Sequence, residues 1–230
     1  MNALNFIYVT DLKCPICNAD IKGTSCRWSL MKLKEREADF HQIYEGAKPL
    51  YYYIQYCPYC HYAACEGHFN KLTDKDIEVV QSFLNEQKNF PYIEPDPMQR
   101  TFEMAEKLYV QAIACLQVRE VPFSYLAGVI IRLAWLYREE GKQEKEKNFL
   151  KLAYQAYEKA FTFDKLPIGS MTKVKVMYLL GEIARRLGDF NEAARWFLMT
   201  LNERAALREE PEIEKMTREQ LALTKAAYAT

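Results

Sequence analysis

The sequence predicts an α+β fold that is mainly α-helical, with a small N-terminal β domain followed by an array of helical hairpins. Three observations lead to this prediction. Six of the seven cysteines and all three histidines lie before residue 70, where short aromatic and β-branched runs are typical of strands. Beyond residue 73 the apolar residues repeat with helical spacing. Only eight glycines occur in 230 residues, about half of average usage, which favours long helices with few turns.

The overall charge and hydropathy exclude several classes of protein. Hydrophobic residues make up 50% of the chain, so intrinsic disorder is excluded. Thirty-one basic residues balance 31 acidic ones, and net charge therefore gives no support for a general affinity for nucleic acid. The N-terminus lacks the features of a signal peptide, and the most apolar run, Tyr125–Tyr137, contains Arg132 and is shorter than the roughly 20 residues that cross a bilayer. We therefore expect a soluble cytoplasmic protein without a membrane partner.

Residues 1–72 form the predicted β domain. Two runs within it, residues 5–9 and 50–56, are rich in strand-forming residues, and each precedes a Cys-Pro-x-Cys sequence. Residues 73–230 form the predicted helical domain. Three prolines within residues 90–97 are incompatible with helix interior, so this stretch is predicted to be linker-like.

The helical domain begins at a predicted capping sequence, Thr73-Asp74-Lys75-Asp76. After Met98 we expect five or six further helices, the last of them a more polar helix after Pro211. Each helix is recognised by apolar residues three or four positions apart and by a nearby glycine or proline. These apolar stripes run from Ile77 to Leu84, Phe102 to Leu116, Leu126 to Tyr137, Phe149 to Ala160, Val176 to Leu187 and Phe190 to Leu201.

Two of the predicted hairpins are related by an internal repeat. Leu180-Gly181, Ala184, Gly188 and Phe197 resemble the tetratricopeptide pattern of small and large residues on paired helices. An earlier copy of this pattern lies 47 residues before it in the chain. In this copy Glu146 occupies a position where the pattern has a small residue, and the spacing of 47 residues exceeds the usual repeat length of about 34. We interpret this region as a tetratricopeptide-like array whose groove holds a protein partner; the alternative is a plain helical bundle. A shift of 47 residues superposes Leu133 on Leu180, Gly141 on Gly188 and Leu150 on Phe197.

Four cysteines form the candidate metal site. Cys14-Pro15-Ile16-Cys17 and Cys57-Pro58-Tyr59-Cys60 share one spacing, and each follows a strand-like run. Two such knuckles offer four thiolates, the ligand set that Zn²⁺ binds tetrahedrally, so we predict one structural Zn²⁺ in a zinc-ribbon-like domain. Two alternatives are four reduced core thiols and a redox pair, since CPYC taken alone resembles the glutaredoxin active site.

Other potential ligands lie near this site in the sequence. Cys26, His41, Cys65 and His68 have no recognisable metal-binding spacing, and whether they contribute to metal binding stays open at this point. Cys115 lies on an apolar helical stripe and is predicted to be a buried small hydrophobe. His61 directly follows Cys60 and is expected to be solvated or to orient its knuckle.

A longer string of residues resembles the bacterial family known as "domain of unknown function 2225". The resemblance implies a zinc-ribbon-like N-terminus, a tetratricopeptide-like remainder, and Cys14, Cys17, Cys57 and Cys60 as metal ligands. Two residues depart from the family pattern: His61 stands where members commonly have Gly, and His41 where a cysteine is often found. The resemblance covers nearly the whole chain and implies no activity. It is carried by Asp39-Phe40, Tyr44-Glu45-Gly46, Pro49-Leu50-Tyr51-Tyr52, Tyr56-Cys57-Pro58-Tyr59-Cys60-His61-Tyr62-Ala63-Ala64 and Phe69.

The function predicted from the sequence is that of a non-enzymatic, zinc-binding protein-interaction or scaffold module. Phosphate loops, dinucleotide-binding glycine motifs, HExxH and GxSxG are all absent from the sequence, so no catalytic residue is assigned. One alternative is a nucleic-acid-binding zinc ribbon that uses Lys13, Lys22 and the exposed members of a tyrosine cluster between residues 51 and 62. A second alternative is a thiol oxidoreductase that uses Cys57 and Cys60.

Overall fold

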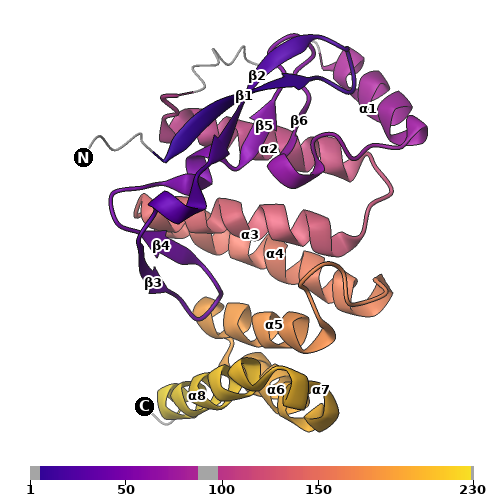
Figure 1. Ribbon diagram of the computed structural model, residues 1–230. Helices are drawn as coiled ribbons and strands as arrows, with labels where there is room; N and C mark the ends of the chain where they lie inside the picture. The colour runs from indigo at the N-terminus through magenta and orange to yellow at the C-terminus, as the bar shows by residue number, and fades with distance from the viewer. Residues whose placement is uncertain (1–5, 88–97, 229–230) are drawn as a thin grey trace. The chain divides into compact units, whose positions relative to one another are not determined.

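The computed structural model describes residues 6–87 and 98–228, so the linker-like stretch 90–97 lies outside the described residues. The described residues are mainly helical, with short antiparallel strand pairs near the N-terminus (Figure 1). The predicted α+β, mainly α fold class is therefore confirmed. Eight α-helices are found in these ranges: α1 (Asp74–Glu86), α2 (Phe102–Gln117), α3 (Phe123–Glu139), α4 (Gln143–Phe163), α5 (Lys173–Leu187), α6 (Phe190–Asn202), α7 (Arg204–Glu209) and α8 (Pro211–Tyr228).

The strands pair as neighbours in sequence, β1 with β2, β3 with β4 and β5 with β6. The run predicted as one strand over residues 50–56 is instead divided between a 3₁₀-helix, Pro49–Tyr52, and the short strand β5. Pro49 occupies the first turn of that helix, where its fixed φ is favourable, and Leu50 is buried there. The strands are β1 (Ile7–Lys13), β2 (Asp20–Cys26), β3 (Leu33–Arg36), β4 (Gln42–Tyr44), β5 (Ile54–Tyr56) and β6 (Ala63–Cys65).

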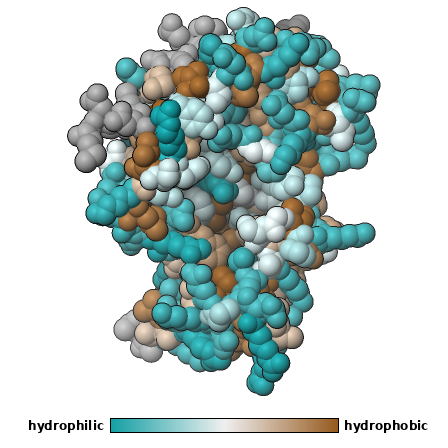
Figure 2. Space-filling view, viewed as in Figure 1, coloured by the Kyte–Doolittle hydropathy of each residue, from teal (hydrophilic) through white to brown (hydrophobic). Residues whose placement is uncertain are grey.

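Packing divides the chain into two compact units. The first unit comprises residues 1–35, 42–121 and 135–141, and the second comprises residues 36–41, 122–134 and 142–230. The predicted domain division between residues 72 and 73 stays a prediction. None of the helices in the described ranges is long and apolar enough to cross a membrane. Polar and charged side chains cover most of the surface visible in Figure 2, with apolar residues scattered among them.

In the first unit, α2 packs against β5 and β6 and anchors the segment before them (Figure 1). Arg100, just before α2, donates from Nη1 to the carbonyl oxygens of Tyr51 (3.2 Å) and Ile54 (2.6 Å). The hydroxyl of Tyr109 on α2 donates to the carbonyl of Leu50 at 3.1 Å. These bonds tie the 3₁₀-helix and the start of β5 to α2 and to the residues just before it.

The start predicted for α1 is confirmed in detail. Thr73 has an extended backbone, and its hydroxyl oxygen accepts a hydrogen bond from the N–H of Asp76. The Asp76 carboxylate accepts in return from the Thr73 N–H at 2.9 Å. This reciprocal capping box satisfies two of the donors that a helix N-terminus otherwise leaves unpaired.

In the second unit, α5 and α6 form a helical hairpin whose turn is made by Gly188. Gly188 adopts a left-handed conformation with φ of 86°, which ends α5, and Asp189 then caps α6. Gly181 lets the helices approach closely, because a Cβ atom there would lie 2.6 Å from the Phe197 ring. α8 packs against both helices of the hairpin. The small and large residues of the repeat therefore meet as their spacing predicts, while a tetratricopeptide-like array stays a prediction.

Candidate metal centre

The two Cys-Pro-x-Cys sequences occupy equivalent places in two β-hairpins. The pairing of β1 with β2 ends where Lys13 lies opposite Asp20, and the loop between these two residues carries the first pair of cysteines. β5 and β6 pair up to Tyr56 opposite Ala63, and the loop between them carries the second pair. Each knuckle is therefore a six-residue connection closed by a strand pair, which fixes where its two cysteines point.

Backbone hydrogen bonds shape the first knuckle. The N–H of Cys14 donates to the carbonyl of Ala19 at 2.9 Å, and the N–H of Asn18 donates to the carbonyl of Cys14 at 2.9 Å. Asn18 closes the loop with φ of 60°, in the left-handed region where Asn is better tolerated than most residues. The knuckle thus has a defined conformation that its own sequence supports.

The second knuckle repeats this pattern bond for bond. The N–H of Cys57 donates to the carbonyl of Tyr62 at 2.8 Å, and the N–H of His61 donates to the carbonyl of Cys57 at 2.9 Å. His61 has φ of 64°, which matches Asn18 in the first knuckle. The left-handed backbone explains physically why this position suits Gly. His61 is also held by a hydrogen bond of 2.6 Å between its Nδ1 and the Tyr56 hydroxyl, so it orients the knuckle.

The four predicted cysteines come together. Their Sγ atoms all lie within 4.8 Å of one another, with Cys14 and Cys60 at 3.5 Å and Cys17 and Cys57 at 3.5 Å. Each short contact joins one cysteine of the first knuckle to one of the second. Cys14 and Cys57 are fully buried, whereas Cys17 is exposed. The cluster therefore links the two hairpins and lies at the edge of the first unit's core.

The donor set fits a tetrahedral metal ion. Zn–S bonds of about 2.3 Å in a regular tetrahedron place neighbouring sulfur atoms about 3.8 Å apart. The observed contacts of 3.5 Å and the upper limit of 4.8 Å bracket this value. In the described parts of the chain, no other group of three or more cysteine, histidine or acidic side chains gathers in this way. The four cysteines are the residues that would hold the ion.

Hydrogen bonds within the cluster move the thiol pKa values in opposite directions. Hydrogen bonds with Cys14 and Cys60 lower the pKa of Cys57 to about 2, which favours the thiolate form of this cysteine. The bond with Cys57 raises the pKa of Cys14, and bonds with Cys14 and Cys57 raise that of Cys60. A divalent cation stabilises thiolates at all of its ligand positions, so binding of the metal would release the protons held here.

A buried glutamine, Gln55, joins the two hairpins. The side chain of Gln55 on β5 accepts a hydrogen bond from the N–H of Thr24 on β2 at 3.0 Å and donates to the carbonyl of Thr24. Gly23 makes room for it, because a Cβ there would lie 2.9 Å from the Gln55 amide oxygen. On the other side, Gln111 of α2 donates to the carbonyl of His61 at 3.0 Å. The sequence patterns gave no indication of either glutamine contact.

The spare ligand types lie outside the four-sulfur cluster. His41 is buried and hydrogen-bonds Glu37 in the second unit, with 2.7 Å between Nδ1 and the carboxylate. Cys65 contacts His68, with 3.2 Å from Sγ to Nδ1. Burial raises the pKa of Cys26 to about 11, so its thiol stays protonated. Cys115 is buried in the core, as its place on an apolar stripe predicts.

Comparisons with known proteins confirm the family resemblance that the sequence indicates. The family described as "Uncharacterized protein conserved in bacteria (DUF2225)" matches residues 7–224. A relative from Borreliella burgdorferi, described as an uncharacterized protein, is 26% identical over 183 residues, which cover 73% of this chain and 66% of the relative. No solved structure matches the chain.

Proposed function

We propose that this chain, which belongs to the DUF2225 family of proteins conserved in bacteria, is a non-enzymatic protein-interaction module built around one structural zinc ion. The observation that carries the proposal is the convergence of four cysteine sulfur atoms from two equivalent hairpins. Four thiolates complete the coordination of Zn²⁺ and leave no position for a reacting water, so such a site supports folding rather than catalysis.

The helical hairpin of α5 and α6 supports the interaction part of the proposal. Helical hairpins stacked side by side present continuous surfaces to partner segments. Phe197, which the repeat pattern singles out, is buried, so it belongs to the packing of the helices. Partner contacts must therefore involve other residues of the helical surface.

The structure around Cys57 does not favour the thiol oxidoreductase alternative. A reactive CPYC cysteine depends on a helix that begins just after it, because the helix N-terminus stabilises the thiolate. Here CPYC is followed by strand β6, and the low pKa of Cys57 comes from hydrogen bonds with Cys14 and Cys60.

The nucleic-acid alternative keeps one favourable observation. Tyr59 is 69% exposed at the tip of its knuckle, where it is available for stacking on a base. Lys22, in contrast, is paired with Asp11. Filter binding at low and moderate salt separates the two functions, because phosphate contacts weaken steeply with salt. Absence of salt-sensitive binding would remove this alternative.

Metal analysis of the purified full chain tests the zinc proposal. We expect about one equivalent of zinc, and less than about half an equivalent would contradict a structural site. Replacement of zinc by Co²⁺ adds a test of geometry, because tetrahedral thiolate coordination gives intense visible absorption bands.

A pair of cysteine variants provides the control. Cys17→Ser changes an exposed side chain, so it should remove metal binding with little direct loss of core packing. Cys26→Ser is the matched control, because Cys26 lies outside the cluster and should leave the metal content unchanged. Equal metal content in both variants would overturn the assignment of Cys17 as a ligand.

A further inference from the structure

The segment Arg36–His41, which comprises the last residue of β3 and the loop that leads to β4, packs as part of the helical unit. We call this segment the tip. Within it, Asp39 and His41 are almost fully buried, and the partly buried Phe40 packs against a core cluster that contains Tyr178 and Phe197. The helical unit thus already holds a short segment of chain that is not helical.

The tip has the backbone of a tight hairpin loop with an unusual residue in it. The N–H of Phe40 donates to the carbonyl of Glu37 at 3.0 Å, and the N–H of Glu37 donates to the carbonyl of His41 at 2.8 Å. Three-residue hairpin loops of this kind end in a left-handed residue, which is usually Gly. Phe40 occupies that position with φ of 70°. A bulky residue there is strained by about 1–2 kcal/mol, so packing of the ring must hold it in place.

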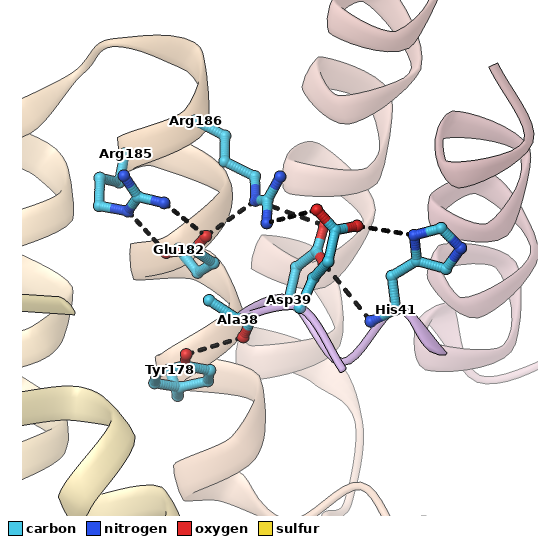
Figure 3. A network of polar contacts seen from close by, with 8 residues as sticks. Ala38, Asp39, His41, Tyr178, Glu182, Arg185 and Arg186 are labelled. Carbon is cyan, nitrogen blue, oxygen red and sulfur yellow. Dashed lines mark hydrogen bonds and ion pairs between the residues drawn. The ribbon is translucent and has the colours of Figure 1, made fainter. Parts of the chain in front are cut away.

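One face of α5 receives the Phe40 ring and the backbone of the tip, and Figure 3 shows the contact between Tyr178 and Ala38. The Phe40 and Tyr178 rings pack with their centroids 5.4 Å apart. The Tyr178 hydroxyl donates to the carbonyl of Ala38 at 2.7 Å. Burial raises the pKa of Tyr178, which keeps the phenol protonated as a donor.

The same face of α5 receives the acidic side chains of the tip. Arg186 lies 3.5 Å from a carboxylate oxygen of Asp39 and 3.5 Å from one of Glu37. Glu182 fixes this guanidinium by accepting from it at 2.8 Å, and Arg185 also donates to Glu182 at 2.8 Å (Figure 3). Arg186 is therefore oriented by Glu182 and pairs with the carboxylates that the tip presents.

We propose that the face of α5 formed by Tyr178, Glu182 and Arg186 is a docking site for a turn in which an acidic residue precedes an aromatic one. In the free protein the tip occupies this site through Asp39 and Phe40. A protein partner that presents the same chemistry takes the place of the tip. This inference rests on the proposed interaction function and specifies its partner by chemistry.

Exchange of the tip for a partner segment is physically reasonable. The tip competes with a partner segment for the site. Because the tip is part of the same chain, its local concentration at the site is roughly millimolar, which favours the tip. Against this advantage stands the strain at Phe40, which a partner with a relaxed backbone at the aromatic residue avoids. A partner with further contacts therefore displaces the tip by mass action.

Peptide binding to the full chain tests the proposal. The probe is a fluorescent peptide with the sequence of residues 33–44, and the test variant is Phe40→Gly, which suits the left-handed turn and removes only the ring from the site. We expect the peptide to bind this variant at least about tenfold more tightly than wild type, because loss of the ring's packing weakens the tethered tip by more than relief of the backbone strain strengthens it. Equal binding to both, or no binding to the variant, would overturn the docking site.

Two further variants establish where the peptide binds. In the Phe40→Gly background, Arg186→Leu should remove peptide binding. Tyr178→Phe, which deletes one hydroxyl, should weaken it about fivefold, as expected for one hydrogen bond. Helical circular dichroism verifies folding, and Tyr178→Phe keeps the test decisive if Arg186→Leu fails to fold. Unchanged affinity in a folded variant would contradict the assignment.

The measurements also separate this inference from the proposals on which it rests. A chain that retains its metal but fails to bind the peptide would overturn the docking site and leave the metal centre intact. Light scattering of wild type identifies the other possible occupant, a second copy of the chain. A dimer that the peptide dissociates would assign the site to self-association and overturn a foreign partner.

Discussion

The two compact units are stabilised by different kinds of interaction. In the first unit the strand pairs are short, and the core cluster includes the candidate metal ligands Cys14 and Cys57. Isolated pairs of short strands are marginally stable in water. In the second unit the core consists mainly of side chains from long helices, such as Tyr178 and Phe197. If the four sulfur atoms hold a metal ion, as proposed, the first unit gains stability from that coordination, whereas the second depends on side-chain packing.

Removal of the metal should have the largest effect on stability. It should destabilise the first unit and leave the second unit folded. Structural zinc contributes about 10–16 kcal/mol of apparent binding energy in small domains, which exceeds the stability of most single domains. With a strong chelator we expect hydrogen-exchange protection to be lost in β1, β2, β5 and β6 and retained in α5 and α6. Mass spectrometry of exchanged peptides measures both regions in one sample.

An outcome that affects both units equally would contradict this separation. Cys26→Ser with its metal bound serves as the control for thiol chemistry outside the cluster, and its exchange should resemble that of wild type. Loss of protection in α5 and α6 upon chelation would mean that the helical unit depends on the metal centre for its fold.

Substitution of two helical glycines tests the packing of the second unit. Gly181→Ala places a Cβ 2.6 Å from the Phe197 ring, which should destabilise the unit by about 1–3 kcal/mol through overpacking. Gly128→Ala is the matched control in α3. Its Cβ would meet only the flexible end of Arg132, at 3.4 Å, so the gain in helix propensity should stabilise by up to about 1 kcal/mol.

Urea denaturation followed by helical circular dichroism measures both glycine variants, and neither should change the metal content. If Gly181→Ala lowers the free energy of unfolding and Gly128→Ala raises it, close packing of α5 on α6 determines the stability of the helical unit. A neutral Gly181→Ala would show instead that the Phe197 ring moves aside readily.

Local sequence patterns predicted the parts of the fold that depend on local physics. The capping box at Thr73, the helix end at Gly188 and the two knuckle spacings each follow from the chemistry of a few neighbouring residues. The spacing of Cys14, Cys17, Cys57 and Cys60 was sufficient to group them, because tetrahedral coordination constrains which thiols pair.

Contacts between distant segments were beyond the reach of these patterns. Phe40 and Asp39 were noticed only as part of a family resemblance, because nothing local indicates that they pack on α5 some 140 residues away. The tip would be expected to carry Gly at a left-handed position, and Phe40 there conceals the turn. Gln55 and Gln111 were missed for the same reason, since an amide on a strand or helix carries no signal of its distant partner.

A partly buried ion pair in the first unit, between Arg119 and Asp76, offers the smallest and most selective test. Burial raises the pKa of Asp76, but hydrogen bonds from Arg119 and Thr73 outweigh it and lower the pKa to about 2. The Arg119 Nε lies 3.0 Å from the carboxylate, and both side chains are largely buried. A carboxyl group whose pKa is lower in the folded state than in the unfolded state stabilises the fold. This contribution is fully present when the pH is above the unfolded-state pKa of about 3.8, and it is lost as the pH falls toward the folded-state pKa of about 2.

Asp76→Asn should therefore cost about 1–2 kcal/mol at pH 7 and the same amount at pH 5, because both values lie above the unfolded-state pKa. Metal-dependent stability behaves differently, since protons compete for the thiolates and weaken zinc binding over this range. Asp74→Asn is the control: Asp74 is exposed in the same helical turn and should change stability by less than about 0.5 kcal/mol. Denaturation at both pH values distinguishes the two contributions within one unit. A penalty for Asp76→Asn that fell between pH 7 and pH 5 in parallel with the metal content would show that the ion pair depends on the metal centre.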